Sequence, residues 1–116
     1  MEKAQVYAKQ KYARISAKKV VPVLNLVRGK SASEAVRILK FDKTKAAKLS
    51  LKVLQSAIAN AKETKNLDEA KLFVADARAE EGNVLKRGRV SGRSRYSRIL
   101  KRMAHIVIGL SEKEIK

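Results

Sequence analysis

The sequence predicts an α+β fold that carries a long basic arm, and three observations support this prediction. Three stretches between residues 16 and 63 have apolar residues at helical spacing, and three other stretches have the alternation or the β-branched content of strands. Almost nothing apolar lies between the last two strand candidates, from about residue 81 to residue 103. At 116 residues the chain can bury a modest core without metal or disulfide, so we expect one domain over residues 1–116.

The first predicted element is a strand near the amino terminus. Residues 3–11 alternate between apolar and polar side chains, with Ala4, Val6 and Ala8 in the apolar set. A period of two is typical of a half-buried strand. We expect this strand at an edge of the sheet.

A helix is predicted from Ser16, which can cap it, to Arg28. Gly29 stands where helices are commonly stopped. Pro22 conflicts with this helix, because its ring removes an amide donor and crowds the preceding turn. Either the helix kinks at Pro22 or its regular part begins near Val21. The apolar face of the helix consists of Val20, Val23, Leu24 and Val27.

Two more helices are predicted after this one. Ser31 and Glu34 have the spacing of a capping box, in which each side chain satisfies the other's backbone amide, and they predict a short helix. Its apolar positions are Ala35, Ile38 and Leu39. Asp42 or Thr44 then begins a longer helix that continues to about Glu63. The apolar stripe of that helix consists of Ala47, Leu51, Leu54, Ile58 and Ala61.

Two antiparallel strands are predicted to complete the sheet. Residues 105–110 form a β-branched run, and residues 71–80 alternate between polar residues and an apolar set of Phe73, Ala75, Ala77 and Ala79. The segment between the two runs is far longer than a usual hairpin loop. If it is a ribbon of about ten residues per side, it reaches on the order of 30 Å from the body at roughly 3.3 Å per residue.

The charge of the chain predicts a polyanionic partner. The 28 Lys and Arg against 11 Asp and Glu leave a net charge of +17, which makes a folded chain repel itself strongly. Residues 86–102 hold eight basic residues and no acid, whereas residues 63–81 hold six acids and three bases. The first thirty residues add eight basic residues against one acid. We therefore expect a basic arm rooted in a milder body that offers a second contact surface.

RNA is the partner that fits this arm best. Phosphates packed inside folded RNA need cations, and arginine can bind phosphate oxygens with two parallel donors or stack on bases. Tyr96 is the only aromatic residue of the arm and can stack on a base. The small residues Gly88, Ser91, Gly92 and Ser94 allow the backbone to approach closely.

Other binding hypotheses explain less of the pattern. A disordered basic tail would not be followed by a strand as regular as residues 105–110. An architectural binder of duplex DNA is the second hypothesis; it would usually dimerise, and no spare apolar helix face or heptad seam is present. Binding to a membrane surface is disfavoured because the arm has almost no apolar face. Lys45, Lys48 and Lys52 share one helix face, which usually marks a solvated surface and less often RNA contact.

The sequence offers little for catalysis, so we expect neither an enzyme nor a cofactor nor a metal. His105 is the only histidine and the chain has no cysteine, which favours a structural or RNA-contacting histidine. Glu80 and Glu81 are adjacent and would point to opposite faces of a strand. No stretch of eighteen apolar residues and no apolar signal segment occurs, so we expect a cytoplasmic protein without membrane contact.

Several motifs occur in an order that is shared with a known family. They are Arg14-Ile15-Ser16, Leu26-Val27-Arg28-Gly29-Lys30, Ile38-Leu39-Lys40-Phe41, Ala57-Ile58-Ala59-Asn60-Ala61, Glu81-Gly82, Leu85-Lys86-Arg87 and Arg98-Ile99-Leu100-Lys101-Arg102-Met103-Ala104-His105-Ile106. With them the chain resembles the bacterial large ribosomal subunit protein twenty-two family from about residue 4 to residue 112, without an obvious gap.

The resemblance implies a fold, a function and partners. The fold is three helices packed on a three-stranded antiparallel sheet, with residues 82–102 as a long extended basic β-hairpin that penetrates RNA. The function is that of a structural constituent of the large ribosomal subunit, which binds 23S-type ribosomal RNA, assists subunit assembly and lines the exit tunnel. The partners are large-subunit ribosomal RNA, neighbouring ribosomal proteins and, in passing, the nascent peptide. The chain would be a monomer within the ribosome of the cytoplasm.

The expected RNA-binding residues come from the basic first thirty residues and from the arm. They are Lys9, Lys11, Arg14, Lys18, Lys19, Lys86, Arg87, Arg89, Arg93, Arg95, Tyr96, Arg98, Lys101 and Arg102. The resemblance makes Val90, Ser91, Gly92 and Arg93 the tip that lines the tunnel. The chain departs from the family here, because Gly88 replaces a usual bulky residue, Val90 a proline, Ser91 an arginine and Ser94 a glycine. Pro22 and Met103-Ala104 also differ from the commoner residues, and we expect a tip of different shape on an unchanged body.

Overall fold

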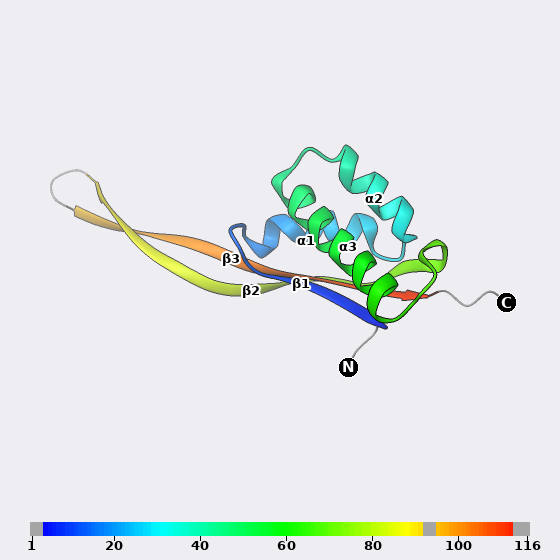
Figure 1. Cartoon of the computed structure of the whole chain (residues 1–116). Coiled ribbons are helices and arrows are strands. Elements are labelled where there is room, and N and C mark those ends of the chain that lie inside the picture. Colours follow the sequence, from blue (N-terminus) through cyan, green and yellow to red (C-terminus); the bar gives the residue numbers. More distant parts are fainter. Residues whose placement is uncertain (1–3, 92–94, 113–116) are drawn as a thin grey trace.

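Three α-helices lie on one face of a three-stranded antiparallel sheet (Figure 1). The computed structural model describes residues 4–91 and 95–112, with only the backbone described for residues 83–101 within these ranges. The elements in chain order are β1 (Val6–Ala13), α1 (Ala17–Val27), α2 (Ala32–Phe41), α3 (Lys45–Thr64), the 3₁₀ turn η1 (Glu69–Lys71), β2 (Leu72–Ser91) and β3 (Arg95–Glu112). The predicted fold class, α+β with three helices on a three-stranded antiparallel sheet, is confirmed.

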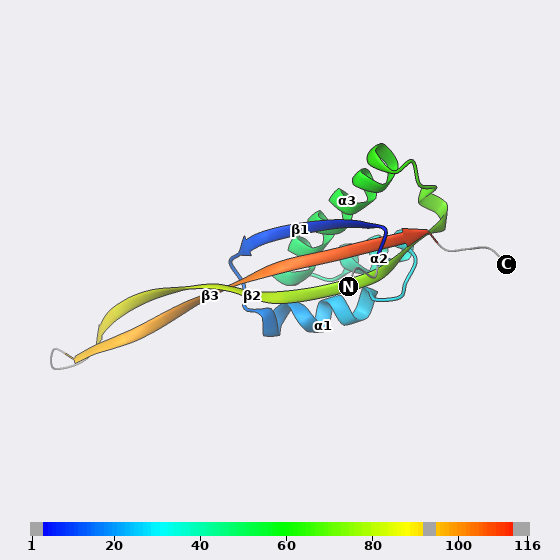
Figure 2. The ribbon, with the colours of Figure 1, turned by 90° about the horizontal axis from the view of Figure 1, so that it is seen from below.

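The last strand of the chain is the central strand of the sheet, whose order is β1-β3-β2. β1 pairs with the end of β3, where Val6 stands opposite Leu110, and it occupies the predicted edge position. β2 pairs with β3 over its whole length, from Leu72 opposite Glu112 to Ser91 opposite Arg95. Because β1 is shorter, β2 and β3 continue beyond the body as a two-stranded ribbon (Figure 2). The molecule is accordingly 69 Å long and only 28 by 21 Å across.

Helix α1 runs without interruption through Pro22. It begins at Ala17, so the alternative in which its regular part begins near Val21 is wrong. The missing amide of Pro22 removes one helical hydrogen bond, but Val20, Val23, Leu24 and Val27 are all buried and hold the helix in the core. After the helix, Gly29 adopts a φ of 83° and its N–H donates to the Val74 carbonyl at 2.9 Å. This turn therefore stops α1 and fixes it to β2.

Hydroxyl side chains cap the other two helices. The Ser31 hydroxyl accepts a hydrogen bond from the Glu34 amide at 3.3 Å, as the capping box predicts. For α3 the cap is Thr44, whose hydroxyl accepts from the Ala47 amide at 3.2 Å. Asp42 lies just outside the helix and accepts from the Thr44 amide at 3.0 Å. The choice between Asp42 and Thr44 is thus settled, and α3 extends one residue beyond the predicted end.

The buried face of α3 is rotated slightly from the predicted stripe. Ala47, Leu54 and Ala61 are fully buried, whereas Leu51 and Ile58 are only half-buried at the edge of the core. Other small or β-branched residues complete the face, namely Ala46, Ser50, Val53 and Ala57. Small residues on this face let α3 lie close to its neighbours.

Because β2 contains a bulge, the predicted apolar alternation of this strand is wrong in its first half. Between Val74 and Asp76 the ladder shifts register, so Ala75 is an extra residue. Before the bulge, Leu72 and Val74 are buried in the core, while Phe73 and Ala75 are only partly buried. After it, Ala77 takes the core side, as predicted. A one-residue shift reverses the faces of a strand, which is why the prediction is wrong for the first half of the apolar set.

Candidate nucleic-acid interface

The predicted basic arm corresponds to the ribbon of β2 and β3. Val90 opposite Tyr96 and Ser91 opposite Arg95 are the last described pairs of this ladder. The tip residues Gly92 and Arg93 lie outside the described residues. The structure describes the backbone, and not the side chains, of most other predicted ribbon contacts, namely Lys86, Arg87, Arg89, Arg95, Tyr96, Arg98 and Lys101.

The register divides the ribbon residues into two sets, because residues that stand opposite one another in an antiparallel pair belong to the same face. One set includes the pairs Lys86 with Leu100, Gly88 with Arg98 and Val84 with Arg102. The other includes Arg87 with Ile99, Arg89 with Ser97, Leu85 with Lys101 and Ser91 with Arg95. Both register sets therefore contain several basic residues.

A cavity of about 440 Å³ lies where the ribbon joins the body. We call it the root cavity. Three segments that are distant in the sequence line it: Ser16, Ala17 and Lys18 at the start of α1, Glu81 and Gly82 on β2, and Arg102 and Met103 on β3. The structure thus brings together two predicted RNA-binding residues, Lys18 and Arg102, both of them exposed.

Lys9 lies apart from this pair, at the β1 edge of the body. It lines a smaller groove of about 220 Å³ together with Lys52 and Ser56 of α3. Its ammonium also pairs with Glu80 at 3.5 Å, and both side chains are about 40% exposed. An exposed ion pair of this kind contributes little to stability, so Lys9 can exchange Glu80 for another anion at low cost.

The remaining body candidates, Lys11, Arg14 and Lys19, are exposed around the junction of β1 and α1. Lys45 of α3 supports this junction, because its ammonium donates to the Arg14 carbonyl at 2.8 Å. Lys45 therefore has a structural contact that its helical spacing did not indicate. Lys48 and Lys52, the other members of its predicted face, are exposed.

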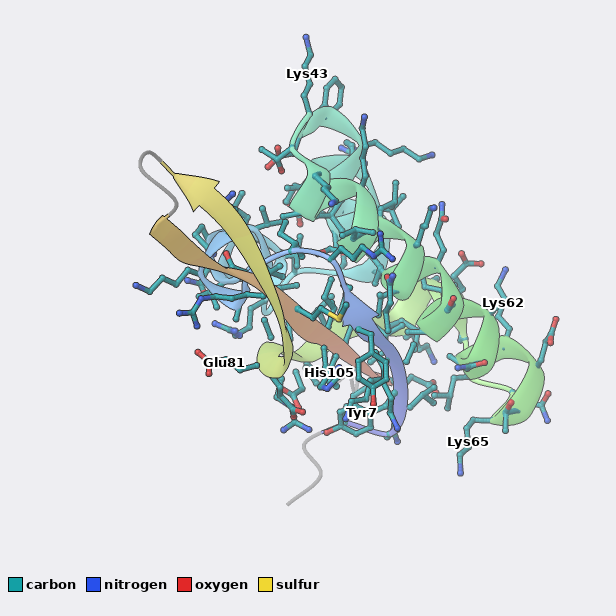
Figure 3. The ribbon with its side chains drawn as sticks, turned by 90° about the vertical axis from the view of Figure 1, so that its left-hand side faces the viewer. Tyr7, Lys43, Lys62, Lys65, Glu81 and His105 are labelled. Carbon is teal, nitrogen blue, oxygen red and sulfur yellow. The ribbon has the colours of Figure 1, made fainter. Side chains whose placement is uncertain are left out.

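His105 has a structural partner. Its Nδ1 accepts a hydrogen bond from the Tyr12 amide at 3.0 Å, and the two rings meet edge to face with centroids 5.0 Å apart. Tyr12 has a φ of 60° and lies where the β1 ladder is irregular. Figure 3, which looks along the length of the sheet, shows the Glu81 side chain pointing away from His105. His105 thus stabilises the irregular end of β1.

The described part of the chain holds no group of three or more His, Asp or Glu side chains that could share a metal ion. Within the same residues, no helix combines the length and the apolar character that crossing a membrane requires.

The fold and the charge distribution define a class: a small basic α+β protein whose central strand extends far beyond its core. Residues 8–111 match the family model described as ribosomal protein L22p/L17e. Over 103 residues the chain is 47% identical to "Large ribosomal subunit protein uL22" of Clostridium novyi (strain NT), a match that covers 89% of this chain and 93% of that relative. The chain therefore belongs to the ribosomal protein L22p/L17e family, whose members are structural and not catalytic. The resemblance inferred from the motifs is confirmed.

Proposed function

We propose that this chain is a structural constituent of the large ribosomal subunit in the cytoplasm, where it binds 23S-type ribosomal RNA and assists subunit assembly. The observation that carries the proposal is the ribbon, which has basic residues at register positions of both faces. Support comes from the 47% identical relative, whose name places that protein in the large ribosomal subunit.

A ribbon with cations on both faces suits a position inside folded RNA. An arm that lay on the RNA surface would need basic residues on one face only. Basic residues in both register sets can neutralise phosphates on two sides at once, which reduces repulsion between RNA segments that approach each other. Residues 82–102 are accordingly the part of the domain that penetrates the RNA.

The body and the tip have separate roles in this proposal. Lys9, Lys11, Arg14, Lys18 and Lys19 bind ribosomal RNA at the base of the ribbon, next to other ribosomal proteins. Residues 90–93 line the exit tunnel, so the nascent peptide passes the tip. The chain acts as a monomer within the ribosome.

Competitive binding tests this function. Bacterial large-subunit ribosomal RNA, transfer RNA and duplex DNA compete for the intact chain and for a ribbonless variant at physiological salt. The variant replaces residues 85–101 with a two-residue Asn-Gly turn, which is suited to join Val84 and Arg102 because these residues stand opposite each other. We expect a preference for ribosomal RNA that is reduced but not abolished in the variant. Equal binding to all three, or a preference for DNA, would overturn the proposal.

A further inference from the structure

The root cavity has the size and the lining of a site for one nucleotide. We propose that it binds a single unpaired nucleotide of RNA, with the base inside and the phosphate at the rim. This inference rests on the proposed function, because the nucleotide belongs to the RNA that surrounds the ribbon.

The geometry of the root cavity fits a ligand of this size. Its volume of about 440 Å³ falls within the range of roughly 300–1,000 Å³ that is usual for small-molecule sites. The ladder of the ribbon shifts register between Glu81 and Val84, and a bulge of this kind bends its strand locally. The cavity lies between this irregular part of the ribbon and the start of α1.

The lining supplies contacts for both parts of a nucleotide. Met103 and Ala17 offer apolar surface against which a base can pack. Lys18 and Arg102, both exposed, offer cations for the phosphate. The Ser16 hydroxyl makes no capping hydrogen bond to its helix, so it can bond to the ribose or the phosphate.

Glu81 favours a nucleotide over a simple phosphate ion as the ligand of the cavity. A carboxylate in the wall repels phosphate, but it accepts hydrogen bonds from the amino group of cytosine, adenine or guanine. The backbone next to Glu81 is closely packed at Gly82. A Cβ on Gly82 would lie 3.1 Å from His105 Cε1 and 3.3 Å from the Met103 carbonyl oxygen. The cavity therefore favours a base with an amino group over uracil.

Two substitutions with matched controls test the proposal. Glu81→Ala removes the acceptor, and Glu63→Ala removes the same charge from an exposed position on α3. Ala17→Leu fills the cavity, and Ala59→Leu adds the same side chain at an exposed position of α3. Affinity for bacterial large-subunit ribosomal RNA is measured against duplex DNA competitor at physiological salt. Thermal melting of each variant checks that it is folded.

A nucleotide site and general electrostatic attraction predict opposite effects of Glu81→Ala on RNA affinity. A nucleotide site predicts that Glu81→Ala and Ala17→Leu each weaken binding about tenfold, the order of a lost base contact, while both controls bind like the parent or slightly more tightly. General electrostatics predicts that Glu81→Ala strengthens binding as Glu63→Ala does. Either cavity variant behaving like its control overturns the inference. If Ala17→Leu has a lower melting temperature than the parent, lost stability explains its weaker binding. The Glu81→Ala result alone then decides whether the cavity is a nucleotide site.

Two further outcomes identify the cause of a failure. If the parent shows no preference for ribosomal RNA over duplex DNA, the proposed function fails and the inference fails with it. If the preference holds but the cavity variants equal their controls, only the inference fails.

Discussion

At the scale of single residues, Gly109 shows how the sheet is fastened together. It stands between Tyr7 of β1 and Asp76 of β2 in the register. A Cβ at this glycine would lie 2.6 Å from Ala4 Cβ and 2.7 Å from Tyr7 Cε1, so the tyrosine ring lies directly over the central strand. The Tyr7 hydroxyl then donates to Asp76 Oδ2 at 3.3 Å. Gly109 thus lets one side chain connect all three strands.

Gly109→Ala should therefore destabilise the protein, although alanine usually suits a strand better than glycine does. The added methyl group overpacks the site, and we expect the free energy of unfolding to fall by about 1–3 kcal/mol. Urea denaturation measures this change. In a Tyr7→Ala background the loss should be smaller but still present, because Ala4 Cβ remains close. A parental urea midpoint for Gly109→Ala would contradict the packing described for Tyr7.

Cross-strand contacts of this kind mark the limit of what the sequence could predict. Alternation placed Tyr7 on the polar side of its strand, and the apolar run placed Gly109 in another strand, but no pattern within one strand indicates which residues stand opposite each other. That depends on register, and bulges change the register at Ala75 and between Glu81 and Val84. For the same reason, the sequence could not predict that Lys18 and Arg102 line the same cavity.

At the scale of elements, the starts of the three helices show what capping residues in the sequence can predict. A serine or threonine immediately precedes each helix in the sequence, and this made the starting points predictable. Only the structure shows that Ser31 and Thr44 accept capping hydrogen bonds whereas Ser16 does not. The difference depends on the orientation of the hydroxyl, which residue type alone does not determine. The prediction also left open a helix whose regular part begins near Val21. The structure begins α1 at Ala17, because its buried face outweighs the hydrogen bond lost at Pro22.

Replacing the caps by alanine tests this difference. Thr44→Ala should lower the free energy of unfolding by about 1 kcal/mol, because the Ala47 amide loses its acceptor. Ser16→Ala is the matched control at the start of α1 and should cost less. Urea denaturation compares the two variants. Equal losses would show that Thr44 does not stabilise α3 by capping.

The core of α3 gives a second test at this scale. Leu54 is fully buried, and Leu54→Ala should destabilise the protein by about 2–5 kcal/mol through the cavity that it leaves. Leu26→Ala on α1 is the control, because Leu26 is 52% exposed and its truncation leaves no internal cavity. Thermal or urea unfolding measures both. A melting temperature of Leu54→Ala identical to that of the parent would show that the buried face of α3 is misassigned.

At the scale of the whole molecule, charge changes along the 69 Å axis. The ribbon at one end holds basic residues without an acid. The opposite end of the body, where α3 ends, mixes both signs, and Lys62 pairs there with Glu69 at 2.5 Å (Figure 1). Under the proposed function, this distribution favours entry of the ribbon into RNA with the far end of the body outside.

The salt dependence of RNA binding tests this uneven distribution of charge. Replacing Arg93 and Arg95 by alanine should weaken binding to ribosomal RNA and lower the salt slope by up to about one unit per lost phosphate contact. Replacing Lys62 and Lys65 by alanine removes the same charge from the far end, where both residues are exposed. That double variant should keep most of the parental slope. Equal slopes for the two double variants would show that RNA senses only the net charge.

The central position of β3 also has a consequence for the order of folding. β3 follows every other described element in the sequence, yet both β1 and β2 need it as their hydrogen-bonding partner. During synthesis, β1 is made first but has no partner strand until residues 106–110 are available. Contacts between distant parts of a chain form slowly, because a long loop must close before any pairing is gained. The helices can therefore form early, but the sheet, and with it a ribbon fixed to a folded body, is completed only after translation has passed the last strand.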